Sequence, residues 1–215
     1  MMTLLFHGPS GSGKDTQAEL LVEKYNFENI GTGEMIRKMV EEGDTDALKA
    51  YEYVKIGKFV PDEIIYKMLP KWVDKYDKNK NWVFVSVVRS VGQIDLFDDL
   101  LKQKGRVLDK FIHFKLDEES AIERMSLRKY CPKCGATYHD KYKPEEKNGF
   151  CSKCGTELIR REDDKPEKIK ERLLEYNRTI EPILDAYRKR GILIEIDASP
   201  SIEDIHEEVV KKLNL

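Results

Sequence analysis

A segment near the amino terminus has the composition of a phosphate-binding loop. Gly8-Pro9-Ser10-Gly11-Ser12-Gly13-Lys14-Asp15-Thr16 follows a short apolar run and precedes a helix-like stretch. Glycines let consecutive backbone N–H groups point at one spot, and the amino end of a following helix attracts anions to it. Lys14 supplies a mobile cation for outer phosphates. The strict motif has Ser or Thr directly after the Lys, whereas here Asp15 occupies that position and Thr16 comes one residue later.

Four cysteines form two pairs, each followed by glycine. The pairs are Cys131-Pro-Lys-Cys134-Gly and Cys151-Ser-Lys-Cys154-Gly, with sixteen residues between Cys134 and Cys151. This spacing is typical of a four-cysteine zinc site, and we expect all four to bind Zn²⁺. A redox role would be expected from one such pair rather than two. Since four thiolates leave no open coordination position, the metal should hold a lobe together and take no part in chemistry.

Length and charge exclude several classes of protein. The chain has 215 residues, and 38 Lys and Arg against 40 Asp and Glu leave a net charge of −2. This balance gives no overall attraction to nucleic acid or an anionic membrane, so any site for phosphates must be local. No apolar run approaches the roughly 18 residues of a membrane span, and the first residues do not resemble a secretory signal. We expect a cytoplasmic monomer with no nucleic-acid or membrane partner.

The elements that must position these residues alternate between strands and helices. This alternation predicts an α/β fold with a five-stranded parallel sheet and helices on both faces, into which the cysteine segment is inserted. The expected strands are Thr3–His7, Phe27–Ile30, Trp82–Val88, Phe111–Leu116 and Ile192–Ile196. The expected helices are Thr16–Lys24, Gly33–Glu42, Asp44–Ile56, Pro61–Tyr76 with Pro70 as an interruption, Ile94–Lys104, Glu118–Lys129, Pro166–Arg190 and Ile202–Leu213.

Further motifs follow in order, and together with the loop they resemble the adenylate kinase family along essentially the whole chain. Gly13-Lys14-Asp15-Thr16-Gln17 resembles the family's loop, which usually has Gly at the Asp15 position. The segment 32–37 (Thr-Gly-Glu-Met-Ile-Arg) is similar to the one that holds the base and phosphate of AMP, and 57–62 (Gly-Lys-Phe-Val-Pro-Asp) to the turn over the AMP. Arg89 and Gln93 match the arginine for the AMP phosphate and the glutamine that recognises adenine.

The second half of the chain continues the resemblance. Arg124 and Arg128 match two arginines on the ATP side, while Arg161 and Arg172 match arginines that bridge both nucleotides. The segment from Cys131 to Cys154 resembles the zinc-stapled lid of one branch of the family. The chain has only 11 Arg against 27 Lys, and six of these Arg lie at motif positions, which argues against a solvated charged surface.

The resemblance implies a P-loop NTPase-like core and phosphoryl transfer from ATP, with Mg²⁺, to AMP, giving two ADP. It divides the chain into a core (1–30, 61–129 and 161–215), an AMP lobe (31–60) and a zinc-binding lid (130–160). The implied ATP-binding residues are Gly8, Ser10, Gly11, Ser12, Gly13, Lys14, Asp15, Thr16, Arg124 and Arg128. The implied AMP-binding residues are Thr32, Gly33, Arg37, Lys58, Phe59, Val60, Arg89, Gln93, Arg161 and Arg172. The implied catalytic residues are Lys14, Arg89, Arg124, Arg128, Arg161 and Arg172.

The chain departs from the family pattern at the end of the third strand. The family's Asp-Gly-Phe-Pro-Arg is replaced by Val85-Ser86-Val87-Val88-Arg89, so the acidic residue that orients the magnesium waters is missing at Val85. Asp15 is an acidic residue gained beside Lys14. Because Mg²⁺ prefers oxygen ligands and keeps several waters, we expect Asp15 to hold the ion through water. The alternative is that Asp15 only stabilises the first turn of its helix.

Other interpretations remain open at this stage. The chain could phosphorylate UMP, CMP or GMP, although Gln93 beside Thr32 favours adenine. Alternatively, it could be a zinc-ribbon protein that binds nucleotides without turnover, or a degenerate kinase in which the loss at Val85 has abolished catalysis. Individually, Thr32 could be only a helix cap and Gln93 only a surface residue. The histidines form no cluster in the sequence and are expected to have no role.

Overall fold

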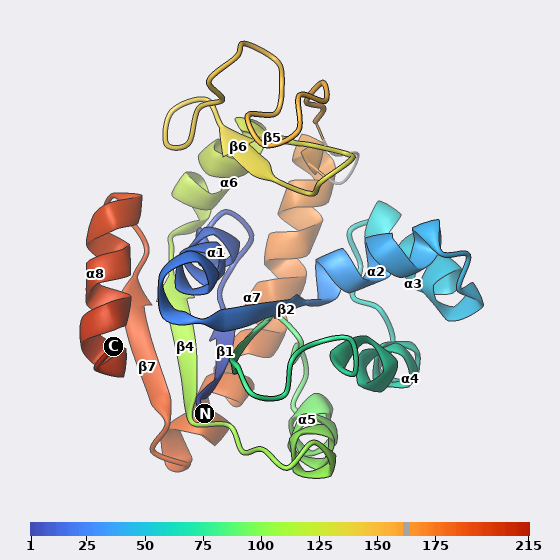
Figure 1. Ribbon diagram of the computed structural model, residues 1–215, viewed down its shortest axis with the longest axis vertical. Coiled ribbons are helices and arrows are strands. Elements are labelled where there is room, and N and C mark those ends of the chain that lie inside the picture. Colours follow the sequence, from blue (N-terminus) through green and yellow to red (C-terminus); the bar gives the residue numbers. More distant parts are fainter. Residues whose placement is uncertain (161–163) are drawn as a thin grey trace.

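The computed structural model describes residues 1–160 and 164–215 and has a five-stranded sheet at its centre (Figure 1). Every strand pair in this sheet is parallel, and the strand order is β2-β3-β1-β4-β7. The five-stranded parallel sheet expected from the sequence is thereby confirmed. The strands are β1 (Thr3–His7), β2 (Phe27–Gly31), β3 (Asn81–Val85), β4 (Lys110–Lys115) and β7 (Leu193–Asp197).

Helices cover both faces of the sheet because its strands are apolar on both sides. Leu4 and Phe6 of β1 pack in one cluster with helices α1 (Lys14–Tyr25) and α8 (Ile202–Leu213). Leu5, between them, packs on the other face in a cluster that includes α4 (Asp62–Val73), α5 (Gly92–Gln103) and α7 (Pro166–Lys189). Side chains alternate across a strand, so a strand buried on both faces has a continuous apolar sequence. The remaining helices are α2 (Thr32–Glu41), α3 (Thr45–Lys55) and α6 (Glu118–Ser126).

Two additions flank the carboxyl edge of the sheet, where parallel α/β folds bind ligands. Helices α2 and α3 project to one side, and the cysteine-containing segment lies beyond α6 at the end of the molecule (Figure 1). That segment begins with an antiparallel ribbon of β5 (Arg128–Tyr130) and β6 (Thr137–His139). Within the described residues, none of the helices has the length and apolar composition needed to cross a membrane.

The strand expected over Trp82–Val88 ends at Val85, three residues early. Ser86 takes a left-handed conformation with φ of 56°, which turns the chain out of the sheet. Val87 and Val88 follow the strand without belonging to it. They remain buried, at 1% and 0% exposure, in the apolar cluster that contains Leu5. At Val87 and Val88 the run of β-branched residues therefore indicates burial in the core and not pairing in the sheet.

Two helices also differ from expectation. Pro70 does not interrupt α4, which continues to Val73 because Trp72 and Val73 are buried in the core. This burial outweighs the cost of a proline inside a helix, about 3 kcal/mol. Helix α6 ends at Ser126 rather than Lys129 because Arg128–Tyr130 pair with Thr137–His139. Arg128 is therefore held on a strand of the lid ribbon, two residues before the expected lid boundary.

Candidate functional site

The glycine-rich segment between β1 and α1 forms a tight loop. Gly8 is held against β4, since a Cβ there would lie 2.6 Å from the Phe114 carbonyl oxygen. Gly11 has φ of 88°, and a Cβ there would lie 2.9 Å from the Ala121 carbonyl oxygen. Side chains at these positions would clash with backbone, so the loop keeps its shape only with glycine. Helix α1 begins at Lys14 and directs its amino end at the space above the loop.

The Lys14 ammonium is enclosed by this loop. Its Nζ lies 3.3 Å from the Pro9 carbonyl oxygen and 3.7 Å from Oδ2 of Asp15, and its side chain is 10% exposed. Burial lowers the pKa of Lys14 to about 8; the Asp15 carboxylate opposes this shift, and the Arg89 guanidinium adds to it. A buried ammonium with a depressed pKa lies in a site short of negative charge, which a phosphate would supply.

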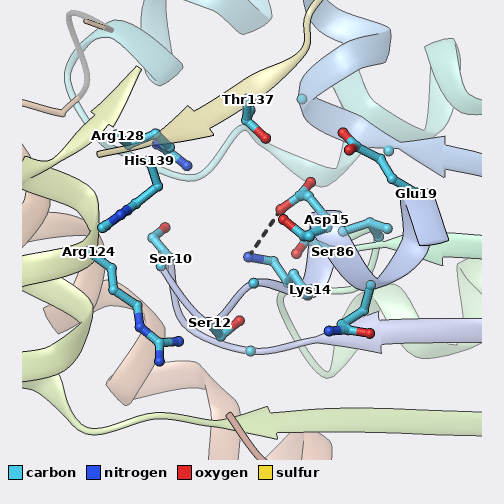
Figure 2. Close-up of a pocket in the computed structure, with 18 of the residues that line it drawn as sticks. Ser10, Ser12, Lys14, Asp15, Glu19, Ser86, Arg124, Arg128, Thr137 and His139 are labelled. Carbon is cyan, nitrogen blue, oxygen red and sulfur yellow. Dashed lines mark ion pairs between the residues drawn. The ribbon is translucent and has the colours of Figure 1, made fainter. Parts of the chain in front are cut away.

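The loop forms part of the floor of a pocket of about 370 Å³. This volume is within the usual range for small-molecule sites, about 300–1,000 Å³. Figure 2 shows the loop residues Ser10, Ser12, Lys14 and Asp15 on one side and Arg124 and Arg128 on another. The lining contains every expected ATP-binding residue, and also Thr32, Gly33, Arg37, Phe59, Arg89 and Arg172 from the expected AMP-binding set.

The arginines that line the pocket are anchored by neighbouring groups. Arg89 donates from Nε to the Ser86 carbonyl at 3.1 Å and lies 4.9 Å from the centre of the Phe59 ring. Burial and, to a smaller extent, the charge of the nearby Arg172 lower the pKa of Arg89 to about 10. Arg128 binds Asp164 with two nitrogens, at 2.8 and 2.5 Å, and Arg172 lies 3.5 Å from the same carboxylate.

Three expected residues lie outside the lining, and one lies outside the described residues. Lys58 is exposed and Val60 belongs to the apolar core. Gln93 is 4% exposed and is engaged within the protein: its Nε2 donates to Asp62 at 2.5 Å, and its Oε1 accepts from the Arg89 backbone N–H at 2.5 Å. Gln93 is therefore not a surface residue. Arg161 falls within the stretch that the structure does not describe.

Several lining residues were missed because no loop or arginine motif contains them. The lid contributes Thr137, His139 and Tyr142, and the Arg124 guanidinium lies 5.0 Å from the centre of the Tyr142 ring. Figure 2 shows His139 and Thr137 facing the pocket from the lid ribbon. The ribbon pairing of His139 with Arg128 brings the histidine to the pocket. A single histidine outside any recognised motif cannot be identified as a pocket residue from the sequence.

His7 is a second histidine that the sequence interpretation left without a role. It lines the pocket, is 3% exposed, and its ring stacks between Phe111 and Tyr176, with centroids 5.8 and 5.6 Å away. The Tyr176 hydroxyl in turn lies 2.7 Å from Nε2 of His113. Burial holds the pKa of His7 well below its usual value, and the Arg89 charge acts in the same direction. His7 and His113 are thus connected through Tyr176, and burial lowers the pKa of both imidazoles.

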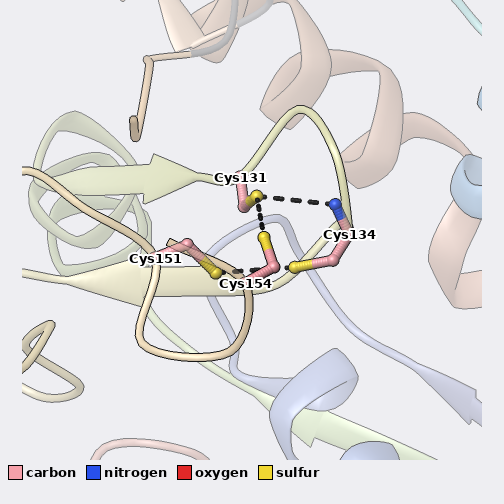
Figure 3. A group of neighbouring side chains, drawn as sticks. All are labelled: Cys131, Cys134, Cys151 and Cys154. Carbon is pink, nitrogen blue, oxygen red and sulfur yellow. Dashed lines mark hydrogen bonds between the residues drawn. The ribbon is translucent and has the colours of Figure 1, made fainter. Parts of the chain in front are cut away.

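The four cysteines converge as their spacing predicts (Figure 3). Their Sγ atoms all lie within 4.8 Å of one another, with 3.4 Å between Cys131 and Cys154 and 3.5 Å between Cys134 and Cys151. A tetrahedral ion with sulfur bonds of about 2.3 Å separates its sulfurs by about 3.8 Å, so the group is the right size to hold a metal.

The cysteine group is also joined to the pocket. The Tyr138 hydroxyl lies 3.2 Å from Sγ of Cys151 and accepts a hydrogen bond from the Ser152 backbone at 3.0 Å. The lining of the pocket includes the continuous stretch from Cys134 to His139. A metal here would shape one wall of the pocket from outside it.

Comparison with known proteins identifies the family. A family model described as adenylate kinase matches residues 6–192. An adenylate kinase of Archaeoglobus fulgidus is 38% identical over 208 residues, covering 97% of this chain and 96% of that protein. An adenylate kinase of Caldicellulosiruptor bescii is 36% identical, covering 100% of this chain and of that protein. An adenylate kinase of Carboxydothermus hydrogenoformans is 37% identical, covering 99% of this chain and of that protein. This chain belongs to the adenylate kinase family. It is therefore a member of the nucleoside monophosphate kinases, which are phosphotransferases.

As an adenylate kinase family member, this chain has an unusual wall beside Lys14. Val85 lines the pocket and is 3% exposed, so an apolar side chain occupies the end of β3. The Asp15 side chain, in contrast, is 59% exposed and also lines the pocket. The carboxylate nearest Lys14 thus comes from the loop rather than from the strand.

The depressed pKa of Lys14 generates a prediction about pH. Bound phosphate should raise this pKa, so binding takes up a proton and affinity falls as pH rises above about 8. With ATP as the probe at constant ionic strength, we expect the dissociation constant from calorimetry to rise about tenfold or more between pH 7 and pH 10. Lys14→Arg keeps its charge and should flatten the dependence between pH 7 and about pH 9, above which Arg89 begins to lose its proton. An affinity of the wild-type chain that is constant from pH 7 to 10 would contradict the assignment.

Proposed function

We propose that this chain catalyses reversible phosphoryl transfer from ATP to AMP, giving two ADP. The observation that carries the proposal is the gathering of Lys14, Arg89 and Arg172 in one pocket, with burial lowering the pKa of both Lys14 and Arg89. Two nucleotides would bring several negative charges to the same place. Transfer of a phosphoryl group depends on positioning and charge stabilisation more than on covalent chemistry by the protein.

The two nucleotides would occupy opposite sides of the pocket. ATP would place its phosphates on the loop and its base near Arg124 and His139, whose planar groups suit stacking on a purine. AMP would lie by Thr32, Gly33 and Arg37, with its phosphate on Arg89. An oxygen of the AMP phosphate then attacks the γ-phosphorus of ATP, and the bond between that phosphorus and the β–γ bridging oxygen breaks. One ADP forms on each side.

The lobes would close around both substrates to exclude water from the γ-phosphate. We assign 31–60 to the AMP lobe, 130–160 to the lid and the remainder to the core. The lid already contacts the core through Lys143, whose Nζ lies 2.8 Å from Glu19 of α1. Arg161 is proposed to bridge the nucleotides with Arg172. We further propose that the enzyme acts as a cytoplasmic monomer without a nucleic-acid or membrane partner.

The acceptor is the first point to test. Although Gln93 lies outside the pocket lining in this structure, its amide retains one hydrogen and one oxygen lone pair beyond its bonds to Asp62 and Arg89, and we propose that these pair with adenine. We expect kcat/KM for AMP to exceed that for UMP, CMP and GMP by at least about tenfold, or about 1.4 kcal/mol. A coupled assay with ATP and Mg²⁺ measures all four. Equal rates with UMP would mean a kinase for another monophosphate, and no turnover with any acceptor would mean a degenerate kinase.

The cysteine group is proposed to bind one structural Zn²⁺. Four sulfur ligands suit zinc, and the ion would hold the lid turns together without an open position for substrate. Gly135 and Gly155, which follow the two pairs, have φ of 74° and 72°, so each turn is closed by a residue that tolerates the left-handed conformation.

Elemental analysis of protein purified without chelator should find one Zn²⁺ per chain. Cys151→Ser should lose the metal and lower the melting temperature by about 5 °C or more, while turnover in the cold is largely retained. Lys133→Ala, an exposed change in the neighbouring turn, is the matched control and should alter neither quantity. Metal-free wild-type protein that melts at the same temperature would refute the zinc assignment.

Magnesium is proposed to accompany ATP and to be held by Asp15 through water. The oxygen ligands near Lys14 suit this ion, which when bound neutralises phosphate charge and orients the phosphates. A carboxylate beside Lys14 would otherwise repel the phosphates, so an intervening cation accounts for its place in the pocket.

The magnesium assignment is tested with two variants. Asp15→Gly should reduce kcat about tenfold or more and raise the Mg²⁺ concentration required, because a metal-orienting carboxylate is lost. Adding Val85→Asp should restore part of the loss by placing a carboxylate on the strand. Steady-state rates across a Mg²⁺ series measure both effects. If Asp15→Gly turns over as fast as the wild-type chain at limiting Mg²⁺, the magnesium assignment is wrong and Asp15 only stabilises the first turn of its helix.

A further inference from the structure

The side-chain amide of Gln93 is held in one orientation by two neighbours of opposite hydrogen-bonding character. Its Nε2 donates to Oδ1 of Asp62, and its Oε1 accepts from the backbone N–H of Arg89, both at 2.5 Å. An ionised carboxylate can only accept, and a backbone N–H can only donate. Turning the amide by 180° would place Oε1 against the carboxylate and Nε2 against the N–H, and both hydrogen bonds would be lost. The two neighbours therefore fix which end of the amide donates and which end accepts.

The carboxylate of Asp62 is itself held in place at the start of α4. Its second oxygen, Oδ2, accepts from Oγ of Ser90 at 3.1 Å. One turn further along the helix, the Tyr66 hydroxyl lies 3.3 Å from the carbonyl oxygen of Val87 and 3.1 Å from that of Gln93. Helix α4 thus binds the segment between β3 and α5 through both residues. Since Gln93 is only 4% exposed, its amide has little freedom to reorient within this frame.

The usual reason for an acidic residue at the start of a helix does not account for these contacts. Asp62 and Glu63 both lie in the first turn of α4, where negative charge is favourable. Glu63 is exposed and supplies this charge by itself. Asp62 instead directs both of its carboxylate oxygens at side chains of the segment after β3. Its contact with Gln93 therefore needs a separate explanation.

The orientation of a glutamine amide decides which purine it can recognise. In adenine the N6 amino group, a donor, lies beside the acceptor N1. In a 6-oxo purine such as hypoxanthine or guanine, an acceptor oxygen lies beside the donor N1–H. An amide that turns freely can pair with either arrangement, because its donor and acceptor exchange places. An amide held in one orientation pairs with only one of them, since the other would set donor against donor and acceptor against acceptor.

We infer that Asp62 is a specificity-determining residue for the monophosphate, which it selects as a positioning residue by fixing the amide of Gln93. This inference rests on the proposed function, in which Gln93 pairs with adenine and Arg89 binds the AMP phosphate. Gln93 lies outside the pocket lining but bonds to the backbone of Arg89, which is part of it. Because the phosphate anchors the nucleotide at this same segment, the base cannot turn over to suit the amide. A 6-amino purine is then accepted and a 6-oxo purine is rejected.

Binding of AMP and of inosine monophosphate to the intact protein tests the inference, because these nucleotides differ only at position 6 and in the proton on N1. Calorimetry measures both affinities. In Asp62→Ala the amide can turn, so the affinity for AMP should fall about three- to tenfold while that for inosine monophosphate rises. The preference for AMP should decrease by about tenfold or more, as expected for loss of a hydrogen bond to a charged group. Glu63→Ala removes a charge from the same turn and should leave the preference unchanged.

Two further variants establish whether Asp62 acts through Gln93. Asp62→Asn keeps an acceptor but also offers a donor, so its preference should lie between those of the wild-type chain and Asp62→Ala. In a Gln93→Ala background, Asp62→Ala should no longer change the preference.

A wild-type preference in Asp62→Ala, or in Asp62→Asn where the alanine variant does not fold, overturns the inference. So does an equal loss of affinity for both nucleotides, because Asp62 would then have only a structural role. A change of preference that persists in the Gln93→Ala background overturns it as well. A wild-type chain that does not bind AMP would instead refute the proposed function.

Discussion

Positive charge held away from water dominates the physics of this protein. Lys14 and Arg89 are buried within one pocket, and each has a lowered pKa because burial penalises its charged form. Concentrating cations in this way is unfavourable in the absence of a ligand, since like charges repel and the desolvation is uncompensated. Phosphate groups would relieve both penalties. The backbone around the pocket accordingly keeps these side chains in place: the Pro9 carbonyl receives the Lys14 ammonium, and the Ser86 carbonyl receives Arg89.

The adjacency of β1 and β3 in the sheet makes this arrangement possible. Their parallel pairing brings the loop after β1 and the turn after β3 to the same edge, with Phe6 opposite Val85. The turn after β3 also orients two groups of the proposed AMP side, because the Ser86 carbonyl accepts hydrogen bonds from Thr32 of α2 and from Arg89. An apolar Val85 ends the strand, so the carboxylate nearest Lys14 belongs to Asp15, directly after Lys14 in the chain.

The lid combines a structural element with a wall of the binding site. Its ribbon starts at Arg128, which is held by Asp164 just before α7, and its pairing places His139 on the pocket. The cysteine group lies directly behind this wall, with the Tyr138 hydroxyl in contact with Cys151. A metal held by these cysteines would therefore help to form the pocket, because the turn from Cys134 also provides lining residues.

The sequence by itself determined the sheet, the phosphate loop, the cysteine cluster and most of the arginines, because each of these depends on local spacing: apolar alternation, glycine positions and paired thiolates. The tertiary structure decided what depends on partners distant in the chain. Strand β3 ends before Ser86, within a run of β-branched residues, because hydrogen bonds with Thr32, Arg89 and Phe6 fix the Ser86 backbone. The Gln93 amide donates a hydrogen bond to Asp62, which is 31 positions away in the chain. His139 lies at the pocket because its strand pairs with β5, and His7 because its ring stacks on Tyr176. Such contacts leave no periodic trace in a sequence, since they arise only when separate elements pack together.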